Sequence, residues 1–103
     1  SRRMVSEMFR PAVTTFLDRM LKDDRAVMRF EEVTVAPGST VAGKTLKDSR
    51  IPEKTGLVIL AVRKGGTGGF IYNPGAEQKI EQGDVLITMG AIHKINALRK
   101  LSQ

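Results

Sequence analysis

GSTVAGKTLKDSRIPEKTGLVILAVRKG, residues 38–65, is the stretch that decides the fold. It begins at Gly38 and continues, after four residues, with Gly43, Lys44 and Thr45, which matches the G-x-x-x-x-G-K-[ST] pattern of phosphate-binding loops. That pattern binds phosphate when a buried strand leads into the glycine loop and a helix leaves it, so that backbone N–H groups converge on the anion. The flanking residues therefore decide whether the chain is a nucleotide hydrolase.

The flanking residues do not meet the requirements of a hydrolase. The preceding segment RFEEVTVA, residues 29–36, carries three charged side chains and predicts a half-exposed strand rather than an apolar one. Pro52 leaves room for only one short helix, about residues 43–49. The next apolar strand ends in Arg63 instead of a magnesium-binding aspartate. We therefore interpret the two glycines as a turn and the start of a short helix, and Lys44 as a solvated side chain.

The remaining pattern predicts four strands and a closing helix. LVILAVR, residues 57–63, is a continuous apolar run typical of a buried central strand. Two further strands are predicted in FIYN and VLITMGA. KGGTGG connects the central strand to FIYN. The turn-rich PGAEQKIEQGD, which has room for one helical turn, connects FIYN to VLITMGA. HKINALRKLSQ predicts an amphipathic helix presenting Ile95, Leu98 and Leu101. The order helix, strand, short helix, three strands, helix predicts an α+β domain with a small four-stranded β-sheet and short helices.

The N-terminal segment predicts helices with an unusually broad apolar stripe. Apolar pairs recur every four residues from Met4 to Leu21, which is helical spacing. Pro11 lies inside this pattern and removes a hydrogen bond, so we expect two helical pieces, the second beginning at Pro11. The stripe needs an opposing apolar surface. A second copy of the chain or a neighbouring domain can supply it, and the alternative is that the helix covers the domain's own sheet.

Composition bounds the function further. The 103 residues indicate one small domain, and 17 basic against 11 acidic residues give a net charge of +6. The basic residues are dispersed among acids, and the aromatics show no stacking pattern, so no nucleic-acid partner is expected. The absence of cysteine excludes disulfides and thiol nucleophiles, and no apolar run reaches the roughly 18 residues that span a bilayer. Neither His93 nor the paired acids have the spacing of a catalytic or calcium site, so we expect no catalytic or metal-binding residues.

The order of these motifs resembles a known family. The stretch 38–65, the Asn-Pro pair at 73–74, GDVLITMG at 83–90 and the terminal helix together resemble the C-terminal lobe of the RCK family, the TrkA-C domain, from Phe30 to Leu101. In that family the G-x-x-x-x-G-K-[ST]-L pattern is a structural strand-to-helix turn. MVSEMFRPAVTTFLDRML resembles the crossover helices that precede the lobe. The resemblance divides the chain into crossover and dimerisation helices, residues 1–25, and a ligand-sensing lobe, residues 26–103.

The resemblance implies a noncatalytic regulatory role in potassium transport. Such a lobe is cytoplasmic and acts at the inner face of the membrane, through a partner or a fused pore domain. The implied partners are a second copy of the chain and the membrane subunit of a potassium channel or transporter. The Rossmann-like lobe that binds NAD or ATP in the family is missing from these residues, so no cofactor is required. Cyclic di-AMP, bound at a two-fold dimer interface, is the candidate effector. A ligand-free scaffold and a divalent-metal-sensing lobe remain the alternatives.

The resemblance also places a candidate ligand site around two strands. A symmetric dinucleotide suits a two-fold interface, because each copy offers the same groups to one phosphate and one base. Arg63 would hold a phosphate, Asn73 would bond an adenine edge, and the apolar neighbours would pack on the base. Because KGGTGG lengthens the connection, Arg63 and Lys64 are rival basic residues. The alternative is that Arg63 is a solvated strand end and the Asn-Pro pair a turn. The full candidate set is Val62, Arg63, Lys64, Ile71, Tyr72, Asn73 and Pro74.

Overall fold

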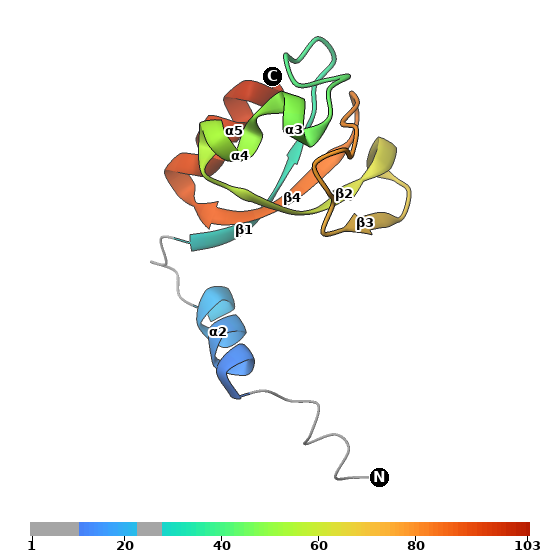
Figure 1. Ribbon diagram of the computed structural model, residues 1–103. Helices are drawn as coiled ribbons and strands as arrows, with labels where there is room; N and C mark the ends of the chain where they lie inside the picture. Colours follow the sequence, from blue (N-terminus) through green and yellow to red (C-terminus); the bar gives the residue numbers. More distant parts are fainter. Residues whose placement is uncertain (1–10, 23–27) are drawn as a thin grey trace.

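The computed structural model describes residues 11–22 and 28–103, and these form one helix followed by an α+β unit (Figure 1). This confirms the predicted fold class and order of strands. The elements are α2 (Pro11–Lys22), β1 (Met28–Thr34), α3 (Leu46–Ser49), α4 (Ile51–Thr55), β2 (Val58–Arg63), a 3₁₀ turn η1 (Lys64–Gly66), β3 (Phe70–Tyr72), β4 (Val85–Ala91) and α5 (Ile92–Ser102).

The four strands form one antiparallel sheet in the order β1-β4-β2-β3. The two apolar strands, β2 and β4, are therefore central, whereas β1 and β3 form the edges. This position explains the charged residues of β1, because an edge strand has one side in solvent. Side chains alternate between the two faces along each strand.

One face of the sheet is covered by the helices α3, α4 and α5, which lie together on that side in Figure 1. Leu86 of β4 lies opposite Val33 of β1 and Val62 of β2, and all three are buried on this covered face. From α5, Ile95 and Leu98 enter the core and Leu101 packs against it, as predicted. The rest of the core comes from Val35, Val41, Leu46, Ile51, Leu57, Ile59 and Ile80.

The opposite face, which we call the open face, carries apolar side chains without a covering element among the described residues. Met89 of β4 lies opposite Phe30 and Val58, and Ala61 of β2 lies opposite Tyr72. The exposed large side chains on this face are Met28, Phe30, Val58, Phe70 and Tyr72.

The glycine loop is a series of turns rather than a phosphate cradle. Gly43 adopts a φ of 87°, and its N–H is turned inward to donate to the Ile80 oxygen at 2.7 Å. The N–H groups of Lys44 and Leu46 likewise donate to backbone oxygens of the chain itself. Lys44 is exposed, as predicted, and Thr45 caps α3 by accepting the Asp48 N–H at 3.1 Å.

The predicted helix at 43–49 needs two corrections. It begins only at Leu46, because the loop before it is held in turns. Pro52 does not end helical structure but lies in the first turn of α4, where a missing N–H costs nothing. The break between α3 and α4 falls at Arg50, whose φ is 57°. The segment 74–84 contains turns and no helix, so the helical turn for which it has room is absent.

Helix α2 begins at Pro11, as predicted for the second helical piece. It buries no residue, and Val13, Phe16, Leu17 and Leu21 remain exposed, so α2 does not cover the sheet of its own chain. The predicted first piece, before Pro11, lies outside the described residues. The predicted boundary between residues 25 and 26 also lies outside them and stays a prediction.

Candidate functional site

The hairpin of β2 and β3 brings the predicted ligand residues together but divides them between the two faces of the sheet. Arg63 pairs with Phe70, Val62 with Ile71, and Ala61 with Tyr72. By strand alternation, Arg63, Phe70 and Tyr72 share the open face. Val62 and Ile71 share the covered face. The Val62 side chain is completely buried in the core, so it stabilises the strand and offers no surface to a ligand.

Arg63 is held as a cation on the open face. Its guanidinium carbon lies 4.9 Å from the centre of the Phe70 ring, and its Nε–H donates to the Gly68 oxygen at 2.8 Å. The Phe70 and Tyr72 rings lie 6.0 Å apart between centroids. Within residues 11–22 and 28–103, no carboxylate is paired with Arg63. The remaining guanidinium N–H groups and two aromatic rings can therefore serve an anion and a flat base.

The rival cation, Lys64, is already neutralised. Its Nζ lies 2.5 Å from Asp84 Oδ2 and 3.3 Å from Glu81 Oε1, and it also donates to the Lys79 oxygen at 3.1 Å. Burial alone would lower the pKa of Lys64, but the hydrogen bonds and charges of the two carboxylates outweigh burial and raise that pKa. Lys64 is thus a structural cation of the turn, and Arg63 is the one that can meet a ligand.

Asp84 organises the turn and was not predicted as a site residue. Its side chain is only 2% exposed, and besides Lys64 it accepts the N–H groups of Gly65 at 2.9 Å and Glu81 at 2.8 Å. Burial would raise the pKa of Asp84, but these hydrogen bonds and the Lys64 charge together lower it. The sequence signal was a lone acid directly before an apolar strand.

Asn73 and Pro74 form a turn that also walls a groove. The Asn73 N–H donates to the Leu60 oxygen at 2.8 Å, and Asn73 adopts a φ of 48°, a conformation that asparagine tolerates better than most residues. The groove has a volume of about 360 Å³ and runs between this turn, the start of β2 and helices α3 and α4. Its wall is mostly apolar, with Lys47 and Glu53 at the rim. The Asn-Pro pair can therefore form a turn and line a ligand-binding groove at the same time.

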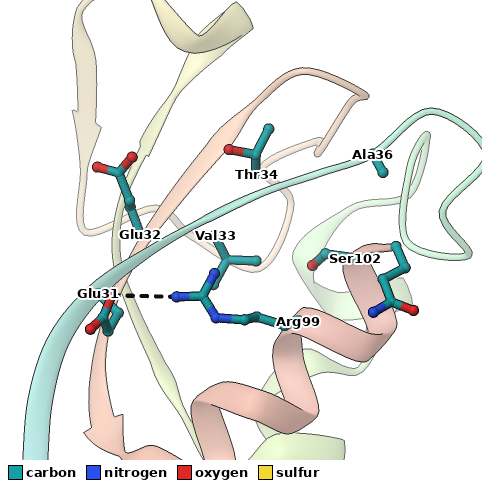
Figure 2. Close-up of a pocket in the computed structure, with 8 residues that line it drawn as sticks. Glu31, Glu32, Val33, Thr34, Ala36, Arg99 and Ser102 are labelled. Atoms are coloured by element: carbon teal, nitrogen blue, oxygen red, sulfur yellow. Dashed lines mark hydrogen bonds and ion pairs between the residues drawn. The ribbon is translucent and has the colours of Figure 1, made fainter.

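A second concave region lies between β1 and α5 (Figure 2). Arg99 reaches across it to Glu31, with 3.3 Å between Nη2 and Oε1. The Ser102 hydroxyl is buried beside it and has no hydrogen-bond partner among the described residues. No predicted site residue lines this region.

The described residues lack two further kinds of feature. They contain no cluster of three or more His, Cys, Asp or Glu side chains that could hold a metal ion. None of their helices is long and apolar enough to cross a membrane.

The sequence model of the TrkA-C domain family matches residues 30–103 of this chain. The chain belongs to the TrkA-C domain family. The match begins at Phe30 on β1 and includes the glycine loop, the hairpin with Arg63 and helix α5. The family resemblance seen in the sequence is therefore confirmed.

Its relatives are potassium transport proteins. The TrkA-C chain is 29% identical over 103 residues to probable potassium channel protein 2 of Methanocaldococcus jannaschii, covering 96% of this chain and 29% of that protein. It is 35% identical over 68 residues to Ktr system potassium uptake protein C of Bacillus subtilis, covering 66% of this chain and 30% of that protein. The chain thus spans less than a third of the length of these relatives.

Two solved TrkA-C-like structures contain cyclic di-AMP. The RCK C domain of the potassium transport protein KtrA in complex with this nucleotide aligns with a TM-score of 0.68 and 27% identity, over 87% of this chain and 95% of that chain. The RCK_C domain dimer of S. agalactiae BusR in complex with the same nucleotide aligns with a TM-score of 0.65 and 28% identity, over 70% of this chain and 92% of that chain.

BusR is also known in complex with busAB-promoter DNA, and that chain aligns with a TM-score of 0.64 and 27% identity over 97% of this chain and 49% of that chain. A TrkA-C-like lobe therefore occurs within a DNA-bound protein. The expectation that the present chain has no nucleic-acid partner receives no support from its relatives and stays a prediction.

Proposed function

We propose that this TrkA-C domain is a noncatalytic, cytoplasmic sensor that regulates a potassium channel or transporter. Two copies bind one cyclic di-AMP at a two-fold interface. The resulting change in the arrangement of the two copies is passed through α2 to the membrane subunit. The observation that carries the proposal is the state of Arg63, which is held over Phe70 without a carboxylate partner among the described residues.

The chemistry of this region suits a dinucleotide. A guanidinium offers a fork of donors that matches phosphate oxygens, and aromatic rings offer a surface to a base. Asn73 has both a donor and an acceptor for an adenine edge. In a two-fold arrangement each copy supplies one such set, which matches the two identical halves of the ligand.

The energies are sufficient for a cellular effector. A hydrogen bond to a charged group contributes about 1.5–3 kcal/mol, so two symmetric Arg63 contacts and two buried bases can supply the roughly 8 kcal/mol of a micromolar complex. Coupling to a channel requires in addition that the ligand prefers one arrangement of the two copies.

Isothermal titration of the chain with cyclic di-AMP tests the proposal. We expect binding with one ligand per two chains, and a loss of affinity of at least about tenfold in Arg63→Ala. Lys100→Ala is the matched control, because it removes an exposed cation from α5 and leaves the hairpin unchanged. Absence of heat at high micromolar ligand would overturn nucleotide sensing.

A ligand-free joining role is the second candidate, and the exposed apolar stripe of α2 favours it. In that case Arg63→Ala leaves the activity of the regulated channel or transporter unchanged, whereas Phe16→Asp on α2 separates the subunits.

A further inference from the structure

The β1 edge of the sheet presents a row of unpaired backbone groups. The Val35 N–H donates to the Asp84 oxygen at 2.9 Å, and the Val35 oxygen accepts the Gly83 N–H at 2.8 Å, so Val35 faces the β4 side. The next N–H, of Ala36, points the other way and donates to the Ser102 oxygen at 2.7 Å. Along an antiparallel strand, the backbone N–H and C=O groups of successive residues point alternately to one side and the other. The groups that point away from β4 therefore belong to Met28, Phe30, Glu32 and Thr34.

This edge is long and open. β1 has seven residues, whereas the other edge strand, β3, has three. Among the described residues, no backbone group bonds to the outer side of β1 before Ala36, where the end of α5 closes the edge. An open edge of this length is a template for another strand.

The charges and the closed end of β1 disfavour most registers for a second copy of the same strand. In an antiparallel pair the strand meets itself about a two-fold axis, and like charges placed opposite each other are unfavourable. An axis at Arg29, Glu31 or Glu32 sets that residue against its own copy. An axis at Val33 or beyond runs the partner strand into Ala36, which is already bonded to Ser102.

An axis at Phe30 avoids each of these conflicts. It places Phe30 opposite its copy, Met28 opposite Glu32, and Arg29 opposite Glu31 of the other chain, so each chain contributes both halves of a charge pair. Glu31 can serve a second cation, because Arg99 donates to its Oε1 (Figure 2) and leaves Oε2 for another donor. Phe30 itself is 38% exposed and would be covered by its twin.

We propose that two copies of this chain join β1 to β1 in antiparallel orientation, centred on Phe30, so that their sheets become continuous. This interface lies at the opposite edge of the sheet from β3 and the Arg63 site, and is separate from the proposed ligand interface. Each lobe therefore has two interfaces with other copies.

Cysteine cross-linking tests the register, because the natural chain contains no cysteine. Opposed hydrogen-bonded residues have Cα atoms about 5.5 Å apart, within the range that a disulfide spans. Under mild oxidation, Phe30→Cys is expected to migrate as a covalent dimer in non-reducing electrophoresis. Glu32→Cys is the matched control, since its two copies are offset by about 13 Å along the strands. Tyr72→Cys, on the other edge, measures random collision.

A mixture of Met28→Cys and Glu32→Cys chains keeps Phe30 intact. It should give a mixed disulfide that neither chain forms alone. The proposal is overturned by equal cross-linking at all positions, by a Glu32→Cys homodimer, or by none at all. Adding Arg63→Ala to Phe30→Cys should leave cross-linking unchanged, so failure of ligand sensing and failure of this interface are distinguished.

Discussion

The Lys64 ammonium and the Asp84 carboxylate, twenty positions apart in the chain, lie 2.5 Å apart and fix the turn that follows β2. Asp84 also holds the Gly65 N–H of this turn. The Gly68 N–H donates to the Lys64 oxygen of this turn, and the Gly68 oxygen accepts the Arg63 Nε–H. This partly buried ion pair thus holds the segment whose Gly68 oxygen positions the Arg63 guanidinium.

The pair predicts how stability depends on pH. The pKa of Asp84 is lowered in the folded chain, so its contribution is present above its unfolded value, about 3.9, and is lost as pH falls through the folded pKa. The pKa of Lys64 is raised, so its contribution is present below about 10.4 and is lost as pH rises through the folded value. Urea unfolding from pH 2 to pH 11 should show the acid loss and the onset of the alkaline loss. Asp84→Asn should flatten the acid limb, and an unchanged limb would contradict this role.

Neighbouring cations in the hairpin should have opposite mutant phenotypes. Lys64→Ala leaves the buried Asp84 charge uncompensated, so we expect it to lower the free energy of unfolding by about 2–3 kcal/mol. Arg63→Ala loses an exposed contact with Phe70, worth about 0.5–1 kcal/mol, but should weaken cyclic di-AMP binding at least about tenfold. Chemical denaturation and titration calorimetry on the two variants measure this contrast. A larger stability loss in Arg63→Ala than in Lys64→Ala would refute the assignment.

Gly90 of β4 lies against the Leu57 side chain and leaves no room for a Cβ. A Cβ built there would lie 2.1 Å from Leu57 Cδ2. Because Leu57 is buried and has little room to move, Gly90→Ala should cost about 1–3 kcal/mol by overpacking. Gly69→Ala is the control, since a Cβ there meets no atom within 4 Å. Thermal unfolding of both variants checks the prediction, and equal melting temperatures would argue against this packing.

Local patterns were enough to predict most of the fold. The two apolar runs, residues 57–63 and 85–91, are the two central strands of the sheet. The charged strand 29–36 was correctly expected to be half exposed, and it lies at an edge. Pro52 was misinterpreted because proline is compatible with a helix start as well as a helix end.

The site was less predictable because it depends on contacts across the chain. Lys64 and Asp84 meet only after the hairpin closes, so nothing local separated Lys64 from Arg63 as the free cation. Val62 was included although alternation turns it into the core. Phe70 was overlooked, although alternation in the short strand places it on the same face as Tyr72.

The central claim is that Arg63 and Asn73 meet a symmetric dinucleotide between two copies of the chain. It is tested most directly by following the Arg63 Nε–H and Asn73 side-chain amide signals by NMR while cyclic di-AMP is added. We predict that both signals shift and that the shifts saturate at about half an equivalent of ligand per chain. The Arg99 Nε–H signal should stay unchanged. No shift at Arg63 and Asn73, or a shift confined to Arg99, would contradict the account.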